Sequence, residues 1–454
     1  MTPTAWLLAF SVMGAGLLIY QCIGVNLSLA SVLLSLMILF HGPAYLYYTR
    51  IYGPDTDFFD TILSAAKGRD PLPTLDLALG LTFTFVCFGI LFANLTLQVN
   101  TRQWQRALAI WAATRVKARA REKQRIVTAG ILLTVALMLP FILIDNQLPK
   151  VINYFTSDLN ELGKIALRRE GGGSEFYLYN LLLANLLPFL AFCMIGLLVA
   201  KVKLSWIQAW GFVTLVAIGK AATLSKAPLA VFMLQCAIVW LMLHRLTLSW
   251  RAMAGLLLFS TLLFGAMSWV ANPASDDFLL VLDFLFYRVF MIVNEGLVEY
   301  FAAIPYVIDH SWGTQSSWVA GLFQTAPRLP TFWLVGEVHR GEIGSTTTVM
   351  FLGDAWADFA WAGVIVTAFI IGGFARWIDI QLIVRRGKSV VSAAGLALGH
   401  FGIFIALSTS FQTALVTGGL AFIVPFVSFL SHRQARARQI PLTAPDGGKS
   451  GQLQ

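Results

Sequence analysis

The chain has 454 residues, of which 57% are hydrophobic and only 12% carry charged side chains. A soluble globular domain devotes about a quarter of its residues to charged side chains, so this composition excludes an ordinary soluble enzyme and indicates a chain surrounded mostly by lipid. The four cysteines all lie in apolar stretches and form no CxxC motif or Cys/His cluster. We therefore expect neither a disulfide framework nor a structural metal site.

Apolar stretches recur along the chain at the length that a helix needs to cross a bilayer. We expect an all-α polytopic membrane protein, with residues 1–431 forming a single transmembrane domain and residues 432–454 a disordered cytoplasmic tail. The first stretch follows no positive residue and no convincing cleavage site, so it is expected to be a retained span. The sequence predicts about 11 transmembrane helices, near residues 5–25, 27–49, 75–97, 126–148, 177–200, 204–222, 226–243, 252–271, 350–375, 390–408 and 411–431.

The distribution of Lys and Arg orients these spans. Residues 98–125 hold eight Lys and Arg against one acid, Glu122, which is typical of a cytoplasmic loop. Alternation then places the C-terminus inside and makes residues 272–346 a long periplasmic segment. The same alternation puts the other short basic loops inside, at 201–203, 244–251 and 376–388. The net charge of +9 is thus a topology signal of a multi-pass protein of the bacterial inner (plasma) membrane, and it predicts no nucleic-acid partner.

Ionisable residues gather in the stretch 278–303, which we expect to lie as a helix at the outer surface. On an α-helix, Arg288, Glu295 and Glu299 would fall within an arc of about 40°. One face would then carry a cation and two carboxylates among apolar residues. Ionisable groups at membrane depth are costly and often functional, although an ion-pair stripe on a solvated face is the alternative.

More charged residues follow in the outer segment and at the start of the next span. Arg328 lies between two prolines of the sequence APRLP, and Arg340 lies in a polar loop with two glutamates and a histidine. Asp354 and Asp358 are four residues apart, so they share one face of a helix. Two like charges this close raise at least one pKa when they are buried, which would make a carboxylate a useful base near neutral pH. Two acids exposed to water at the interface are the alternative.

Two further cations complete the outer face of the predicted topology. Lys226 lies at the outer junction of two spans, and Arg169 precedes a run of three glycines. Either could pair with a phosphate group, and either could simply reach out to water. The sequence lacks a phosphate-binding glycine loop, and sugar nucleotides are not available outside the inner membrane. A glycosyl donor on this side would therefore be attached to a lipid, and its pyrophosphate leaving group would need positive charge to stabilise it.

Four segments resemble the O-antigen and exopolysaccharide repeat-unit polymerases of the Wzy type. They are SKAPL at 225–229, RVFMIVNEGLVEYF at 288–301, GTQSSWVAGLFQTAPR at 313–328 and GSTTTVMFLGDAWADFAWAG at 344–363. The resemblance covers about half of the chain in its motifs and the whole chain in its layout of spans. Asp354 stands where members of the family often carry Glu, which keeps the charge but shortens its reach.

The resemblance implies a helical fold related to lipid-dependent membrane glycosyltransferases. It also implies the transfer of a glycan from undecaprenyl pyrophosphate onto another lipid-linked repeat unit, with no metal, nucleotide or other cofactor. The partners would be that lipid-linked glycan, membrane lipid and a chain-length regulator protein. By the same resemblance, Glu295 and Asp354 are the candidate bases. Lys226, Arg288 and Arg328 would bind substrate, and Arg340 and Arg169 are further candidates.

Three other classes of function remain open at this point. An O-antigen ligase would use the same donor but transfer the glycan to lipid A-core. A flippase or transporter would carry its ionisable groups near the middle of the bilayer, whereas most of them here lie toward the outer face. An envelope scaffold would leave the buried-looking charges without a role.

Overall fold

The part of the chain that the computed structural model describes is helical. It comprises residues 2–116, 120–135, 152, 177–201, 206–221, 226–244, 246–247, 249–271, 278–315, 329–341, 347 and 349–431. No β-strand occurs within these residues, where Asn26 and Thr247 form an isolated bridge. The all-α prediction is therefore confirmed for the described residues, while the predicted tail at 432–454 lies outside them.

Six stretches of the described part are long and apolar enough to cross a membrane, so the chain is a multi-pass membrane protein. Each overlaps one of the spans expected from the sequence. The stretches are Pro3–Ile23, Leu29–Asp55, Leu72–Thr96, Asn180–Val199, Phe351–Arg386 and Phe411–Leu430. Two shorter apolar helices, Pro228–His244 and Val390–Ala406, match two more expected spans. Most of the expected span 126–148 lies outside the described residues.

Several of the long stretches consist of consecutive helical pieces. The six long stretches and the shorter helix Val390–Ala406 comprise α1 (Pro3–Leu18), η1 (Ile19–Ile23), α2 (Leu29–His41), α3 (Pro43–Tyr47), η2 (Tyr48–Tyr52), η3 (Gly53–Asp55), α5 (Leu72–Thr96), α11 (Tyr177–Ala184), α12 (Leu186–Val199), α20 (Phe351–Asp379), η6 (Ile380–Arg386), α21 (Val390–Ala406), α22 (Phe411–Val416), η7 (Leu420–Phe422) and α23 (Ile423–Leu430). The remaining helices are α4 (Asp57–Ser64), α6 (Thr101–Ala113), α7 (Ala120–Leu133), α13 (Trp206–Ala221), α14 (Lys226–His244), α15 (Trp250–Ala271), α16 (Phe278–Phe286), η5 (Tyr287–Met291), α17 (Ile292–Ala303) and α19 (Thr331–Arg340).

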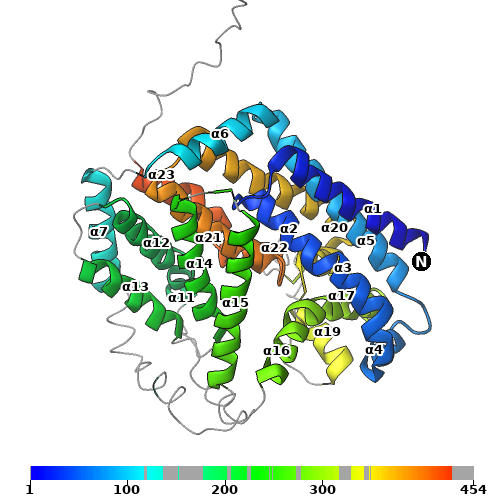
Figure 1. The fold of residues 1–454 in the computed structure, drawn as a ribbon. Coiled ribbons are helices and arrows are strands. Elements are labelled where there is room, and N and C mark those ends of the chain that lie inside the picture. Colours follow the sequence, from blue (N-terminus) through cyan, green and yellow to red (C-terminus); the bar gives the residue numbers. More distant parts are fainter. Residues whose placement is uncertain are drawn as a thin grey trace, which may run out of the picture.

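Helices α5 and α20 form the closest pair, and α1 packs along the outside of α5 (Figure 1). Glycine permits this approach, because a Cβ on Gly89 would run into the carbonyl of Phe369, and one on Gly372 would run into that of Val86. Small residues at a helix crossing bring backbones together in a lipid environment, where dispersion contacts replace the hydrophobic effect as the main attraction between helices.

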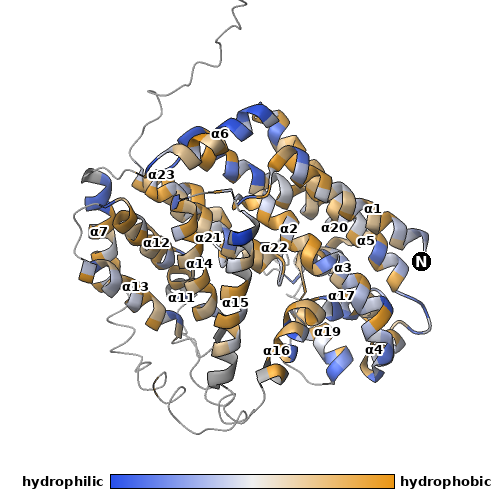
Figure 2. Cartoon of the chain, viewed as in Figure 1, coloured by the Kyte–Doolittle hydropathy of each residue, from blue (hydrophilic) through white to orange (hydrophobic). Residues whose placement is uncertain are grey.

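Polar residues mark two regions of the helix assembly. Figure 2 shows mostly hydrophobic turns along the long helices, with conspicuous hydrophilic turns on α6 and α19. Helix α6 begins with a capping box between Asn100 and Gln103, and it buries Trp104 and Trp111. The indole of Trp104 donates to the carbonyl of Ile23 at 2.7 Å. This amphipathic helix is therefore fixed to the ends of the spans beside it.

Helix α20 is broken near one end. Phe359 and Ala360 leave helical geometry, with φ of −135° and +50°. The chain turns so sharply that a Cβ on Gly363 would collide with the carbonyl of Ala355, eight residues earlier. The break separates a short piece, 351–358, from the long piece that packs on α5. It places Asp354 and Asp358 on the short piece, close to α17.

Candidate functional site

Helix α17 brings carboxylates into the protein interior just outside the expected spans. Every residue from Asn294 to Ala303 is buried, including Glu295 and Glu299. Burying a carboxylate requires partners that replace its lost hydration. The arrangement of those partners defines the candidate site.

The first carboxylate, Glu299, is held by two donors from beyond its own helix. Arg340, the last residue of α19, donates from Nη2 to Glu299 Oε1 at 2.7 Å, and the Thr347 hydroxyl donates to Oε2 at 2.6 Å. The side chain of Glu299 is fully buried, whereas 31% of the Arg340 side chain is exposed. The guanidinium is thus oriented by a buried carboxylate while part of it still faces outward.

The second carboxylate, Glu295, lies between Arg340 and two tyrosines. Arg340 Nη2 is 3.8 Å from Glu295 Oε1. The hydroxyls of Tyr287 and Tyr48 both donate to Oε2, at 2.8 Å and 3.5 Å. Glu295 and Arg340, proposed from the sequence as a base and a substrate-binding cation, therefore lie together, with one guanidinium shared between two carboxylates.

A π-helical turn decides which residues of the stretch 278–303 face this cluster. Residues of a π-turn advance roughly 80–85° each, compared with 100° in an α-helix. Across η5, Tyr287 consequently reaches the face of Glu295, whereas Arg288 is turned away by roughly a right angle. The expectation that Arg288, Glu295 and Glu299 share one face is therefore corrected. Arg288 is exposed and lies over the ring of Phe284 at 5.2 Å.

Burial shifts the proton affinity of the cluster. It raises the pKa of Glu299 to about 7, although Thr347 and Arg340 lower that pKa by stabilising the charged form. Burial also raises the pKa of Glu295 against the effects of Tyr287 and Arg340. His339 donates from Nε2 to the carbonyl of Glu299 at 3.0 Å, and burial lowers its pKa, so the imidazole adds no positive charge at neutral pH. The cluster holds both a cation and a carboxylate, Glu299, that can exchange a proton near neutral pH.

A second pair of acids is linked to the cluster through α17. Tyr300 donates to Asp354 at 3.2 Å. Asp358 accepts hydrogen bonds from Ser311 and from Gln315, the latter at 2.7 Å. Asp354 and Asp358 share a face of the short helical piece, as their spacing predicts, and each has a separate donor.

The other cations proposed from the sequence are not brought to this cluster within the described part. Lys226 is the first residue of α14, and its side chain is not described. Arg169 and Arg328 lie outside the described residues. Sequence reasoning missed Thr347, Tyr48 and Tyr287 as parts of the site. The tyrosine-rich run at 45–52 was the available signal for Tyr48.

A comparable ion pair lies elsewhere in the fold. Arg50 Nη2 is 2.7 Å from Asp76 Oδ2, with 32% of the arginine side chain exposed and none of the aspartate. Tyr45 donates to the other oxygen of Asp76 at 2.8 Å. In distance and burial this pair closely resembles Arg340–Glu299, but no second carboxylate of the described residues forms an ion pair with Arg50.

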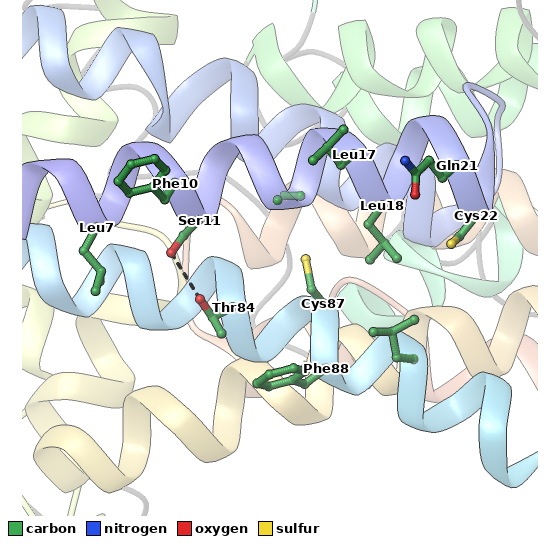
Figure 3. A pocket seen from close by; sticks show the side chains of 13 residues that line it. Leu7, Phe10, Ser11, Leu17, Leu18, Gln21, Cys22, Thr84, Cys87 and Phe88 are labelled. Carbon is green, nitrogen blue, oxygen red and sulfur yellow. Dashed lines mark hydrogen bonds between the residues drawn. The ribbon is translucent and has the colours of Figure 1, made fainter.

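Two other features of the described residues bear on the site. They contain no group of three His, Cys, Asp or Glu placed to hold a metal ion. A hollow of about 540 Å³ lies between α1 and α5, where Ser11 and Thr84 are hydrogen-bonded at 3.2 Å among mainly apolar side chains (Figure 3). That hollow lies along two candidate spans and carries no ionisable pair.

Comparison with known proteins assigns no family. No family model matches the chain, and no curated protein or solved structure is detectably similar to it. Functional reasoning therefore rests on the geometry of the site and on the sequence motifs.

Proposed function

We propose that the chain polymerises undecaprenyl-pyrophosphate-linked oligosaccharide repeat units at the outer face of the bacterial inner membrane. The observation that carries this proposal is the convergence of three separate motif segments at and beside one polar cluster. Glu299 of the segment 288–301 accepts a hydrogen bond from Thr347 of the segment 344–363. Gln315 of the segment 313–328 donates to Asp358 in the same later segment.

The proposed reaction depends on the contrast between the buried Glu299 and the partly exposed Arg340. Glu299 orients Arg340, and the outward part of that guanidinium contacts the pyrophosphate of the donor. Glu295, held by Tyr287, accepts the proton of the acceptor hydroxyl. The hydroxyl oxygen then forms a bond to the anomeric carbon as the bond from that carbon to the pyrophosphate breaks, and undecaprenyl pyrophosphate leaves.

Charge balance requires further cations for this chemistry. One guanidinium faces two carboxylates, so a pyrophosphate needs positive charge from elsewhere, even with one carboxylate protonated. Lys226, Arg328 and Arg169 are the proposed sources, since Arg288 faces away from the cluster. Asp354 remains the alternative base, connected to the cluster through Tyr300.

The proposal includes the finer topology. It places 11 spans in the membrane, α17 and α19 on the outer side, and the basic residues 98–125 and the C-terminus in the cytoplasm. A donor at the outer face would then arrive already attached to its lipid, and the energy for transfer would come from the pyrophosphate linkage.

Deletion of the gene in its host, followed by analysis of lipid-linked glycans, tests the function. Loss of a polymerase leaves single repeat units that still reach the cell surface and are transferred there, with no long chains. Loss of a ligase instead leaves long chains on the lipid, and loss of a flippase leaves single units facing the cytoplasm. Either of these last two patterns would contradict the proposal.

A further inference from the structure

The loop that contains His310, Ser311 and Trp312 binds to the broken region of α20. Its backbone is strained at Trp312, and the indole of Trp312 is mostly exposed. Trp312 has φ of +52°, a region that bulky residues rarely adopt, and 61% of its side chain is exposed. A backbone held in this region costs about 1–3 kcal/mol, and such strain concentrates at ligand sites. An indole that stays exposed does not recover that cost by packing.

The loop is built around the groups freed by the helix break. In a continuous helix the carbonyls of Trp356, Ala357 and Asp358 would bond to amides four residues later. Here the imidazole Nδ1 of His310 donates to the first at 2.9 Å. The amides of Ser311 and Trp312 donate to the other two at 2.8 Å and 2.9 Å. The carbonyl of Asp358, freed by the break, thus fixes the position of Trp312 by accepting from the Trp312 amide.

Aromatic rings and hydrogen-bonding groups lie side by side at this place. The rings of Trp312, His310, Trp356 and Trp361 follow one another, with successive centroids 6.1, 5.2 and 5.1 Å apart. Next to this row, Asp358 is buried and accepts from Ser311 and Gln315. The row is thus open at Trp312 and polar along its side.

We propose that Trp312 and the Asp358 cluster form a subsite that binds one sugar ring of a glycan. One face of a pyranose presents C–H groups that are attracted to the negative face of an indole, while its edge carries hydroxyls. The exposed indole matches the first feature. Gln315, which is half-buried and held by the buried Asp358, offers a polar group for the second. Tyr300, the residue after Glu299, donates to Asp354, which lies four residues before Asp358 on the same short helical piece. This connects the subsite to the Glu295–Arg340 cluster, where the proposed function, on which this inference rests, requires a repeat unit.

Binding of the free oligosaccharide repeat unit, without lipid, tests the subsite. The protein in nanodiscs is titrated with the unit released from the host's own polymer, and binding is followed by saturation-transfer NMR. Trp312→Leu keeps an apolar side chain but removes the ring, and we expect it to weaken binding roughly tenfold or more. Trp312→Tyr keeps a ring and should retain most of the affinity.

Trp206→Leu is the matched control, because Trp206 is 68% exposed and lies at the end of α13. It should bind as the wild type does, and thermal unfolding of each variant shows that the protein is folded. Wild-type affinity in Trp312→Leu, equal weakening in Trp206→Leu, or no binding by the wild type would overturn the subsite. If binding depends on Trp312 but the deletion strain still makes long polymer, the proposed function fails and the subsite stands. If the deletion strain loses its polymer but binding is independent of Trp312, only the subsite fails.

Discussion

At the scale of single residues, substitution of two partly exposed arginines, Arg340 and Arg50, distinguishes an effect on stability from an effect on glycan transfer. Arg340 and Arg50 each form a 2.7 Å ion pair with a fully buried carboxylate. Replacing either by Ala leaves a buried acid without its cation, so both variants should lose stability. Among the described residues, Arg340 lies within 4 Å of a second carboxylate and Arg50 does not, so the loss of Arg340 should affect transfer and the loss of Arg50 should not.

We predict that Arg340→Ala reduces polymer formation by roughly 10- to 100-fold, the loss of one charge-assisted contact. Arg50→Ala should lower the melting temperature by a similar amount but leave activity per folded molecule near that of the wild type. Arg340→Lys should restore activity only in part, because an ammonium group lacks the fork that reaches Glu299, Glu295 and Thr347. Equal loss of activity in Arg340→Ala and Arg50→Ala would mean that Arg340 has only a structural role.

The raised pKa of Glu299 leads to a prediction about stability. The folded chain binds a proton here more tightly than the unfolded chain, since burial raises the pKa from 4.5 to about 7. Deprotonation between pH 4.5 and 7 should therefore destabilise the folded state. Glu299→Gln should remove this contribution, so its melting temperature relative to the wild type should rise across that window. Glu337→Gln, at an exposed glutamate of the same helix α19, is the matched control. A constant difference between Glu299→Gln and the wild type would contradict the assignment.

Residue-scale features show what the sequence could and could not predict about the site. Glu295 and Arg340 were selected because charge is rare in such an apolar chain. The pairing of Glu299 with Arg340 spans 41 residues and depends on tertiary packing, which no local pattern encodes. The displacement of Arg288 comes from a π-turn that composition does not indicate.

At the scale of helices, the break in α20 positions the two acids of its short piece, Asp354 and Asp358. The apolar stretch at 350–375 was expected to be one span. Phe359 and Ala360 are not typical turn residues, so the local sequence gives little sign of the break apart from the nearby Gly363. Gly363 is the point at which the two pieces meet, with no room for a Cβ beside the carbonyl of Ala355. By contrast, the space around Gly14 on α1 is open.

We predict that Gly363→Ala lowers both the melting temperature and polymer formation, because the added methyl forces the break apart and moves Asp354 and Asp358. Gly14→Ala should leave the melting temperature unchanged or higher, since Ala is favoured over Gly within a helix by about 1 kcal/mol. Thermal unfolding and polymer length measured on both variants check this. A Gly363→Ala variant as stable and active as the wild type would show that the break is not required.

At the scale of the whole molecule, hydropathy predicted the positions of the six long apolar stretches found in the described residues, because the apolarity of a stretch is a local property of the chain. The expected stretches near 5–25, 75–97 and 411–431 differ from the observed helices by only a few residues at their ends. Orientation across the membrane is a separate question, which depends on charge outside the spans.

Cysteine labelling tests that orientation. In a variant without the four native cysteines, a cysteine replacing Ala112 should react only with reagent that has entered the cytoplasm. A cysteine replacing Glu337 should react with an impermeant reagent added from outside. Both positions are exposed, so access within the protein does not limit the reaction. Outside labelling at 112 would invert the topology and place the Glu295–Arg340 cluster on the cytoplasmic side.

Elongation by the purified protein tests the central claim most directly. The protein in nanodiscs is mixed with undecaprenyl-pyrophosphate-linked repeat units, a chelator and no nucleotide. We expect a ladder of longer lipid-linked chains that is lost in Arg340→Ala and kept in Arg50→Ala. The ladder should weaken as the pH falls and the accepting carboxylate is protonated. An absolute requirement for a sugar nucleotide or a divalent ion, or transfer to lipid A-core without any ladder, would contradict it.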